Sequence, residues 1–185
     1  MTTYNAIEAP FTVPVREMQR NDLARFFQWF MDIVPKRVEE LSRLVKSTPG
    51  FEFWVPDYDP SSLDTLGHWF AGQIETIDPS KPVDESGNKF TFRTYSLAMD
   101  VGIYLSQVLC KNYPELKWVQ PTKHKRFIDY GQPALAHFGR TVMNPPRLVL
   151  GLAYGIARKT SNGTELRRVY NYWAELDHEE KPLLD

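Results

Sequence analysis

The spacing of apolar residues along the chain predicts a series of amphipathic helices. The clearest begins where Asn21 or Asp22 can cap a helix, because apolar side chains then recur every three or four positions. The side chains of this stripe are Leu23, Phe26, Phe27, Phe30, Ile33 and Val34. Pro35 has no backbone N–H to donate, so the pattern predicts either one bent helix or two helices, with an end at Pro49 and Gly50.

The same spacing predicts two helices in the middle of the chain. Ser61 or Ser62 can cap a helix whose apolar row is Leu63, Leu66, Phe70, Ile74 and Ile77. The central helix is expected over 95–113, where the core-facing side chains are Leu97, Val101, Tyr104, Leu105, Val108 and Leu109. Its second stripe is Ala98, Gly102 and Ser106, and small side chains of this kind allow another backbone to approach closely.

Two further helices are expected towards the end of the chain. Asn144 stands before two prolines, which favours a helix start, and the segment 145–159 is apolar nearly all round. We therefore expect that helix to be mostly buried. The last helix is expected over 164–176 and would bury Leu166, Val169, Tyr170 and Trp173. The predicted total is about six helices.

Short alternating patterns in the second half predict a small β element. Two strands are expected over 116–120 and 132–138, separated by a basic loop, and Phe127 with Ile128 could add a third. The predicted fold is thus a mainly α-helical α+β domain that spans 1–185. A flexible loop is expected at 78–89, which is rich in Pro, Ser, Gly and charge, and a frayed acidic tail at 177–185.

Composition places the chain among reduced globular proteins. Its 185 residues and 42% apolar content suit one domain with one core. The single cysteine, Cys110, cannot form an internal disulfide, and 1–11 lacks the pattern of a secretory signal. The longest apolar stretch, 148–157, is too short to cross a bilayer. These features predict a cytoplasmic protein with no membrane partner.

Motifs for catalysis, metals or cofactors are missing from the sequence. The histidines, which are His68, His124, His137 and His178, are too scattered to form a metal-binding pair on one helix. There is no nucleophile elbow, phosphate-binding glycine loop or dinucleotide fingerprint. Cys110 lies on the predicted central helix, where a buried thiol behaves as a small apolar group. We therefore predict a non-enzymatic protein without catalytic residues, metal or cofactor.

Charge is unevenly distributed, which favours a protein partner. Residues 93–168 carry twelve Lys and Arg against four Asp and Glu, and the rest of the chain is acidic. Trp54, Asp57, Tyr58 and Asp59 combine acidic groups with aromatic rings, as a binding hot spot for a basic partner requires. The alternative is that these aromatic rings fill the edge of the core.

Two other functions remain open from the sequence. A small enzyme would need Asp100, His137, Tyr130 and Arg93 to meet in a cleft, and the favoured alternative is that Asp100 and Arg93 form a buried structural pair. A nucleic-acid contact could use the basic loop, with Lys117, Lys123, His124, Lys125 and Arg126 beside Trp118, Phe127 and Tyr130. The pI near 6.4 makes nucleic acid the less favoured partner. Periodicity does not decide the oligomeric state.

The second half of the chain contains the runs Tyr95-Ser-Leu-Ala-Met-Asp-Val-Gly-Ile-Tyr-Leu, Asn112-Tyr-Pro-Glu-Leu-Lys-Trp, Gly131-Gln-Pro and Asn144-Pro. These runs resemble an uncharacterised group of small bacterial cytosolic proteins that are immunity-protein-like in character. The group has no assigned activity, so the resemblance transfers no site residue. What it implies is an immunity or antitoxin-like role, in which the protein occludes a partner such as a basic toxin.

Overall fold

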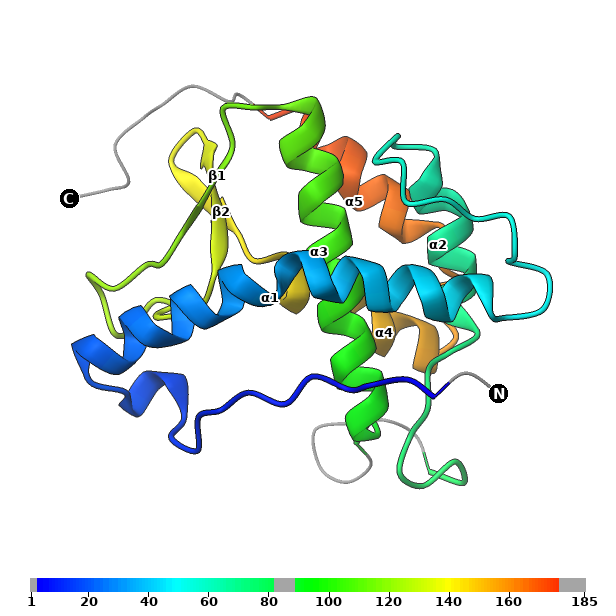
Figure 1. Ribbon diagram of the computed structural model, residues 1–185, viewed down its shortest axis with the longest axis horizontal. Helices are drawn as coiled ribbons and strands as arrows, with labels where there is room; N and C mark the ends of the chain where they lie inside the picture. Colours follow the sequence, from blue (N-terminus) through cyan, green and yellow to red (C-terminus); the bar gives the residue numbers. More distant parts are fainter. Residues whose placement is uncertain (1–2, 82–88, 177–185) are drawn as a thin grey trace.

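The computed structural model describes residues 3–81 and 89–176, which form five α-helices, a short 3₁₀ helix and a three-stranded antiparallel sheet (Figure 1). The helices are α1 (Arg20–Lys46), α2 (Ser62–Ala71), α3 (Phe92–Asn112), α4 (Pro145–Ala157) and α5 (Glu165–Ala174), and η1 (Val15–Glu17) precedes α1. The strands are β1 (Lys117–Val119), β2 (Ala134–Phe138) and β3 (Thr141–Met143). The mainly helical α+β fold is confirmed, with one helix fewer than predicted.

The lower helix count is explained by α1, which continues through Pro35 as one element of 27 residues. Its buried side chains keep the same spacing on both sides of the proline, from Phe30 and Val34 to Val38 and Leu41. Tertiary packing of this stripe outweighs the one hydrogen bond that proline removes. The predicted cap was wrong. Gln19 is the N-cap and makes no side-chain bond, and Asn21 and Asp22 lie inside the helix.

Helix α3 is the centre of the fold, as predicted. Figure 1 shows α3 running through the middle of the molecule, with the sheet on one side and α2 and α5 on the other. The row of apolar side chains expected to face the core, from Leu97 to Leu109, is fully buried. Residues from all five helices join it in one main hydrophobic cluster.

The small-residue stripe of α3 receives the start of α4. A Cβ added to Gly102 would lie only 2.6 Å from the backbone nitrogen of Pro146, so only glycine allows this approach. The close packing predicted for this stripe is therefore made within the chain. Asn144 caps α4 as expected, because its side chain accepts a hydrogen bond from the N–H of Arg147.

Helix α4 is less buried than predicted. Only Pro145, Val149 and Ala153 are fully buried, because the helix packs on α3 along one face and leaves the opposite face partly open. Helix α2 also ends earlier than the apolar row implied. Ile74 and Ile77 follow it in a connection that pairs Thr76 with Phe90, and Ile77 is 68% exposed.

The sheet has the order β1-β2-β3, with both neighbouring pairs antiparallel. Lys117 pairs with Ala136 and Val119 with Ala134, so the two predicted strands do form adjacent partners. The third strand is Thr141–Met143, whereas Phe127 and Ile128 lie in the loop between β1 and β2. The sequence does not distinguish these two segments, because both are too short to show the alternation that marks a strand.

Two predicted segments fall wholly or partly outside the described residues. Of the flexible loop expected at 78–89, residues 82–88 are outside them, and so is the whole tail at 177–185. Across 3–81 and 89–176, none of the helices combines the length and apolar character that crossing a bilayer requires.

Candidate functional site

The predicted partner face lies in the connector between α1 and α2. Two of its four residues, Asp57 and Asp59, are exposed, whereas Trp54 is buried and Tyr58 is half-buried. Trp54 is only 5% exposed, its Nε1–H donates to the carbonyl of Ser62 at 3.0 Å, and its ring meets Tyr104 edge-on at 5.2 Å. A ring in this position cannot serve as a surface anchor. Trp54 instead fixes the connector to the core, as the alternative interpretation of the aromatic rings proposed.

Tyr58 also ties the connector to α3. Its ring stacks on Tyr104 at 5.7 Å, and its backbone N–H donates to the Tyr104 hydroxyl at 3.3 Å. The side-chain amide of Asn112 donates to the Tyr58 carbonyl at 3.2 Å. These contacts hold Tyr58 at a φ of 63°, a left-handed conformation that a bulky residue keeps only when its surroundings enforce it. The backbone of the connector is therefore fixed.

Asp57 and Asp59 are exposed, as a partner face requires. Oδ1 of Asp57 accepts the N–H of Asp59 at 3.0 Å, and Oδ1 of Asp59 accepts the N–H of Ser61 at 2.8 Å. The hydrogen bonds from Ser61 lower the pKa of Asp59. Hydrogen bonds from its own N–H and from that of Gly50 likewise lower the pKa of Glu52. The connector thus holds negative charges in defined positions.

The most exposed aromatic ring of the connector was not among the four residues that the sequence selected. Phe53 is 94% exposed and Val55 is 54% exposed, on either side of the buried Trp54. A signal was present, because three consecutive large apolar residues in a proline-broken connector cannot all point into one core. We use the term connector face for Glu52, Phe53, Val55, Asp57 and Asp59.

The candidate enzyme residues make separate sets of contacts. Asp100 is fully buried and accepts two hydrogen bonds from Arg37, from Nε at 2.7 Å and from Nη2 at 2.6 Å. The Tyr4 hydroxyl donates to it at 2.6 Å. Burial raises the pKa of Asp100 to about 6, although the bonds from Arg37 oppose the shift. Asp100 is therefore a structural carboxylate that joins α1, α3 and the N-terminal segment.

The other three candidates lie elsewhere. Arg93 donates to Gln73 and forms an ion pair with Glu75 at 3.2 Å, so the predicted pairing of Arg93 with Asp100 was wrong. The packing of α1 against α3 places Arg37 at that carboxylate instead. Tyr130 is buried in a satellite cluster with Leu23 and Phe26. His137 lies on β2 with a φ of 79°.

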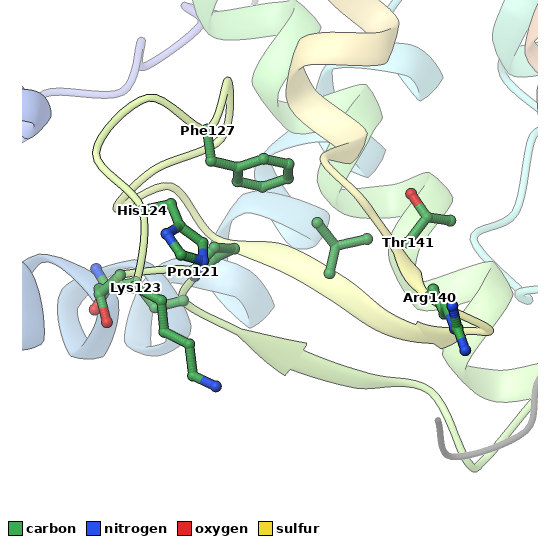
Figure 2. Close-up of a pocket in the computed structure, with 9 residues that line it drawn as sticks. Pro121, Lys123, His124, Phe127, Arg140 and Thr141 are labelled. Atoms are coloured by element: carbon green, nitrogen blue, oxygen red, sulfur yellow. The ribbon is translucent and has the colours of Figure 1, made fainter. Parts of the chain in front are cut away.

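The basic loop of the sequence borders a cavity of about 350 Å³, which we call the basic pocket (Figure 2). The lining residues are Gln120, Pro121, Thr122, Lys123, His124, Phe127, Arg140, Thr141 and Val142. In Figure 2 the loop after β1 supplies Lys123, His124 and Phe127, and the β2–β3 turn and the start of β3 supply Arg140 and Thr141 from the opposite side. Arg140 was not among the residues that the sequence singled out.

The structure removes two rings from the predicted nucleic-acid set. Trp118 packs edge-on against Phe30 at 5.1 Å, and Tyr130 is 7% exposed. Neither ring lines the pocket. Of that set, only Lys123, His124 and Phe127 are brought together around it.

The loop that forms one wall of the basic pocket is held by hydrogen bonds to its backbone. The guanidinium of Arg16 donates to the carbonyls of Lys125 at 3.0 Å, Phe127 at 3.1 Å and Ile128 at 3.2 Å. The next residue, Asp129, is buried and forms an ion pair of 2.7 Å with Arg147 at the start of α4. These contacts hold this wall of the basic pocket in place.

Metal and thiol chemistry find no support in the described part of the chain. Over those residues, no group of three or more His, Cys, Asp and Glu side chains could hold a metal ion. Burial raises the pKa of the half-buried Cys110 thiol to about 11, so the reactive thiolate is scarce at neutral pH.

Comparisons with models of protein families, with curated protein sequences and with solved structures found no match.

Proposed function

We propose that this protein is a non-enzymatic binding module whose connector face covers a basic surface on a protein partner. In its most concrete form this is an immunity or antitoxin-like role, in which a rigid module occludes the active surface of a basic toxin in a bacterial cytoplasm. The partner-binding residues are then Phe53, Val55, Asp57 and Asp59, with Trp54 and Tyr58 as the supports behind them.

The observation that carries the proposal is the exposure of Phe53. A phenyl ring that is 94% exposed on a fixed backbone has its whole surface available for a partner. Burying such a ring contributes roughly 1.5–3 kcal/mol. Aromatic anchors of this kind dominate the energetics of protein interfaces.

Rigidity of the connector supports the same proposal. The contacts of Trp54 and Tyr58 with Tyr104 fix the backbone on both sides of Val55. Because the chain is already ordered, binding costs little conformational entropy at this surface.

The negative charge of the connector face favours a basic partner. Glu52, Asp57 and Asp59 flank the apolar pair in the sequence, and hydrogen bonds lower the pKa of Glu52 and of Asp59. Negative charge around an apolar anchor favours a basic partner and speeds its encounter with the protein. An acidic partner would be repelled by the same groups.

Capture experiments with three tagged proteins test the proposal. The wild-type chain, Phe53→Ala and Phe92→Ala are each used to capture partners from a native lysate, and captured proteins are identified by mass spectrometry. Phe92 is the matched control, because its ring is 60% exposed but lies at the start of α3, away from the connector. We expect one stoichiometric basic protein with the wild type and Phe92→Ala and its loss with Phe53→Ala. Equal capture by all three, or no stoichiometric partner, contradicts the proposal.

The charged residues are tested separately with the purified partner. In Asp57→Asn with Asp59→Asn, the remaining Oδ1 atoms still accept the backbone N–H groups, so the fold of the connector is kept. We expect the association rate to fall and to lose much of its dependence on salt, while the dissociation rate changes little. An unchanged association rate would remove charge steering from the account.

A further inference from the structure

We propose that the basic pocket is a second binding site, separate from the connector face, and that it takes a small phosphate ester with a planar ring, of the size of a nucleoside monophosphate. This inference goes beyond the proposed function and does not depend on it. The pocket and the connector face share no residue.

The charge of the walls favours an anion. Lys123 and Arg140 approach the cavity from its two opposite sides, and none of the described residues that line it is acidic (Figure 2). A cation at either end of the cavity can form a charge-assisted hydrogen bond with an anionic group there, and Arg140 lies next to Thr141 in the chain. Thr122, Thr141 and the His124 ring add further groups able to bond to phosphate oxygens.

The apolar part of the pocket favours a planar ring. Phe127 is 39% exposed and its ring borders the cavity, and Pro121 and the buried Val142 contribute further apolar surface. Stacking of a nucleobase on an aromatic side chain contributes roughly 1–3 kcal/mol. A volume of about 350 Å³ lies near the lower end of the range for small-ligand sites, which is roughly 300–1,000 Å³.

The pocket is also formed before any ligand enters. The three hydrogen bonds from Arg16 hold the backbone at Lys125, Phe127 and Ile128, which positions the aromatic wall. On the opposite wall, Thr141 is paired with Phe138 across the β2–β3 turn. A preformed site binds without the cost of ordering a loop.

Titrations of the full chain with AMP, adenosine and inorganic phosphate test the proposal, by calorimetry and by ¹H–¹⁵N NMR. We expect AMP to bind more tightly than either fragment, with shifts at residues 120–127 and 140–142. Arg140→Ala should weaken AMP about ten-fold, as loss of one charge-assisted bond implies. Phe127→Ala should weaken AMP but leave phosphate binding unchanged.

Two control variants show whether the effect is specific to the basic pocket. Arg168→Ala removes an arginine that is 76% exposed on α5, and it should leave AMP binding unchanged. Phe53→Ala should also leave it unchanged, which makes the test independent of the connector face. The NMR spectrum of each variant reports whether the protein is folded, and Arg140→Gln replaces Arg140→Ala if the latter is not.

Three results would overturn the proposal. They are no saturable binding of AMP, binding of AMP no tighter than that of inorganic phosphate, and equal weakening by Arg168→Ala and Arg140→Ala. A single-stranded oligonucleotide that binds far more tightly than AMP would assign the pocket to a nucleic-acid strand and also overturn it.

Discussion

Replacing Arg37 by methionine should give a protein whose stability falls as the pH rises. Methionine keeps part of the apolar stem of the arginine but removes the two hydrogen bonds of 2.7 and 2.6 Å to the buried Asp100. Removing one partner of a buried ion pair typically costs about 3–5 kcal/mol. Most of that cost arises because a carboxylate with no exposed surface is left without its counter-charge.

The pH dependence follows from the direction of the pKa shift. In the wild type, burial already raises the pKa of Asp100 to about 6 against the opposing effect of Arg37. Without Arg37 the pKa must rise further. The folded state then holds a proton that the unfolded state has lost, so the free energy of unfolding decreases with rising pH up to the new pKa. The gap between variant and wild type therefore widens above pH 6 by about 1.4 kcal/mol for each unit of further shift.

Urea unfolding at pH 5 and pH 8, followed by tryptophan fluorescence, measures this effect. We expect a small difference between Arg37→Met and wild type at pH 5 and a large one at pH 8. The double variant Arg37→Met with Asp100→Asn cannot ionise at this position and should lose the extra pH dependence. A loss of stability that is equal at both pH values, or that persists unchanged in the double variant, would show that the effect does not come from ionisation of Asp100.

Two further predictions concern packing and the thiol. Gly102→Ala should lower the free energy of unfolding by about 1–3 kcal/mol or more, because its Cβ would lie 2.6 Å from the backbone of Pro146. Gly151→Ala, which meets nothing within 4 Å on α4, should instead raise it by about 0.5–1 kcal/mol, and urea unfolding of both variants checks the contrast. Cys110, with a pKa of about 11, should react with a thiol reagent far more slowly in the folded protein than in urea at pH 7.5. Equal rates in the two states would show that the thiol is not protected.

The helices could be predicted because each apolar row meets one continuous core. The central helix was expected over 95–113 from its buried row and is found at Phe92–Asn112, where the Thr91 side chain caps an earlier start by accepting the N–H of Thr94. The end of α2 was not predictable in the same way. Ile74 has helical spacing from Phe70, but the chain turns after Ala71 to pair Thr76 with Phe90.

Contacts between distant residues limited what the sequence could show of the sites. The sequence suggested Arg93 as the structural partner of Asp100. The actual partner is Arg37, 63 positions away, which reaches Asp100 because α1 crosses α3. Composition located the connector face but favoured Trp54 over Phe53, because which ring enters the core depends on Tyr104 and Ser62.

The basic pocket also depends on contacts between residues that are distant in the sequence. Lys123, His124 and Phe127 were noticed as a basic and aromatic loop, and their pairing with Arg140 depends on how the β2–β3 turn lies against that loop. Gln120 follows β1 beside the start of β2, whereas Arg140 follows the end of β2, so the cavity extends along this strand pair.

The most direct test of the connector face is the affinity of the purified partner for Phe53→Ala, measured by calorimetry beside the wild type and Phe92→Ala. We expect Phe53→Ala to weaken binding about 30-fold or more, as loss of a hot-spot ring of about 2 kcal/mol implies, and Phe92→Ala to change it little. Equal affinity of all three proteins would contradict this expectation, because the ring that carries the proposal would then contribute nothing to the complex.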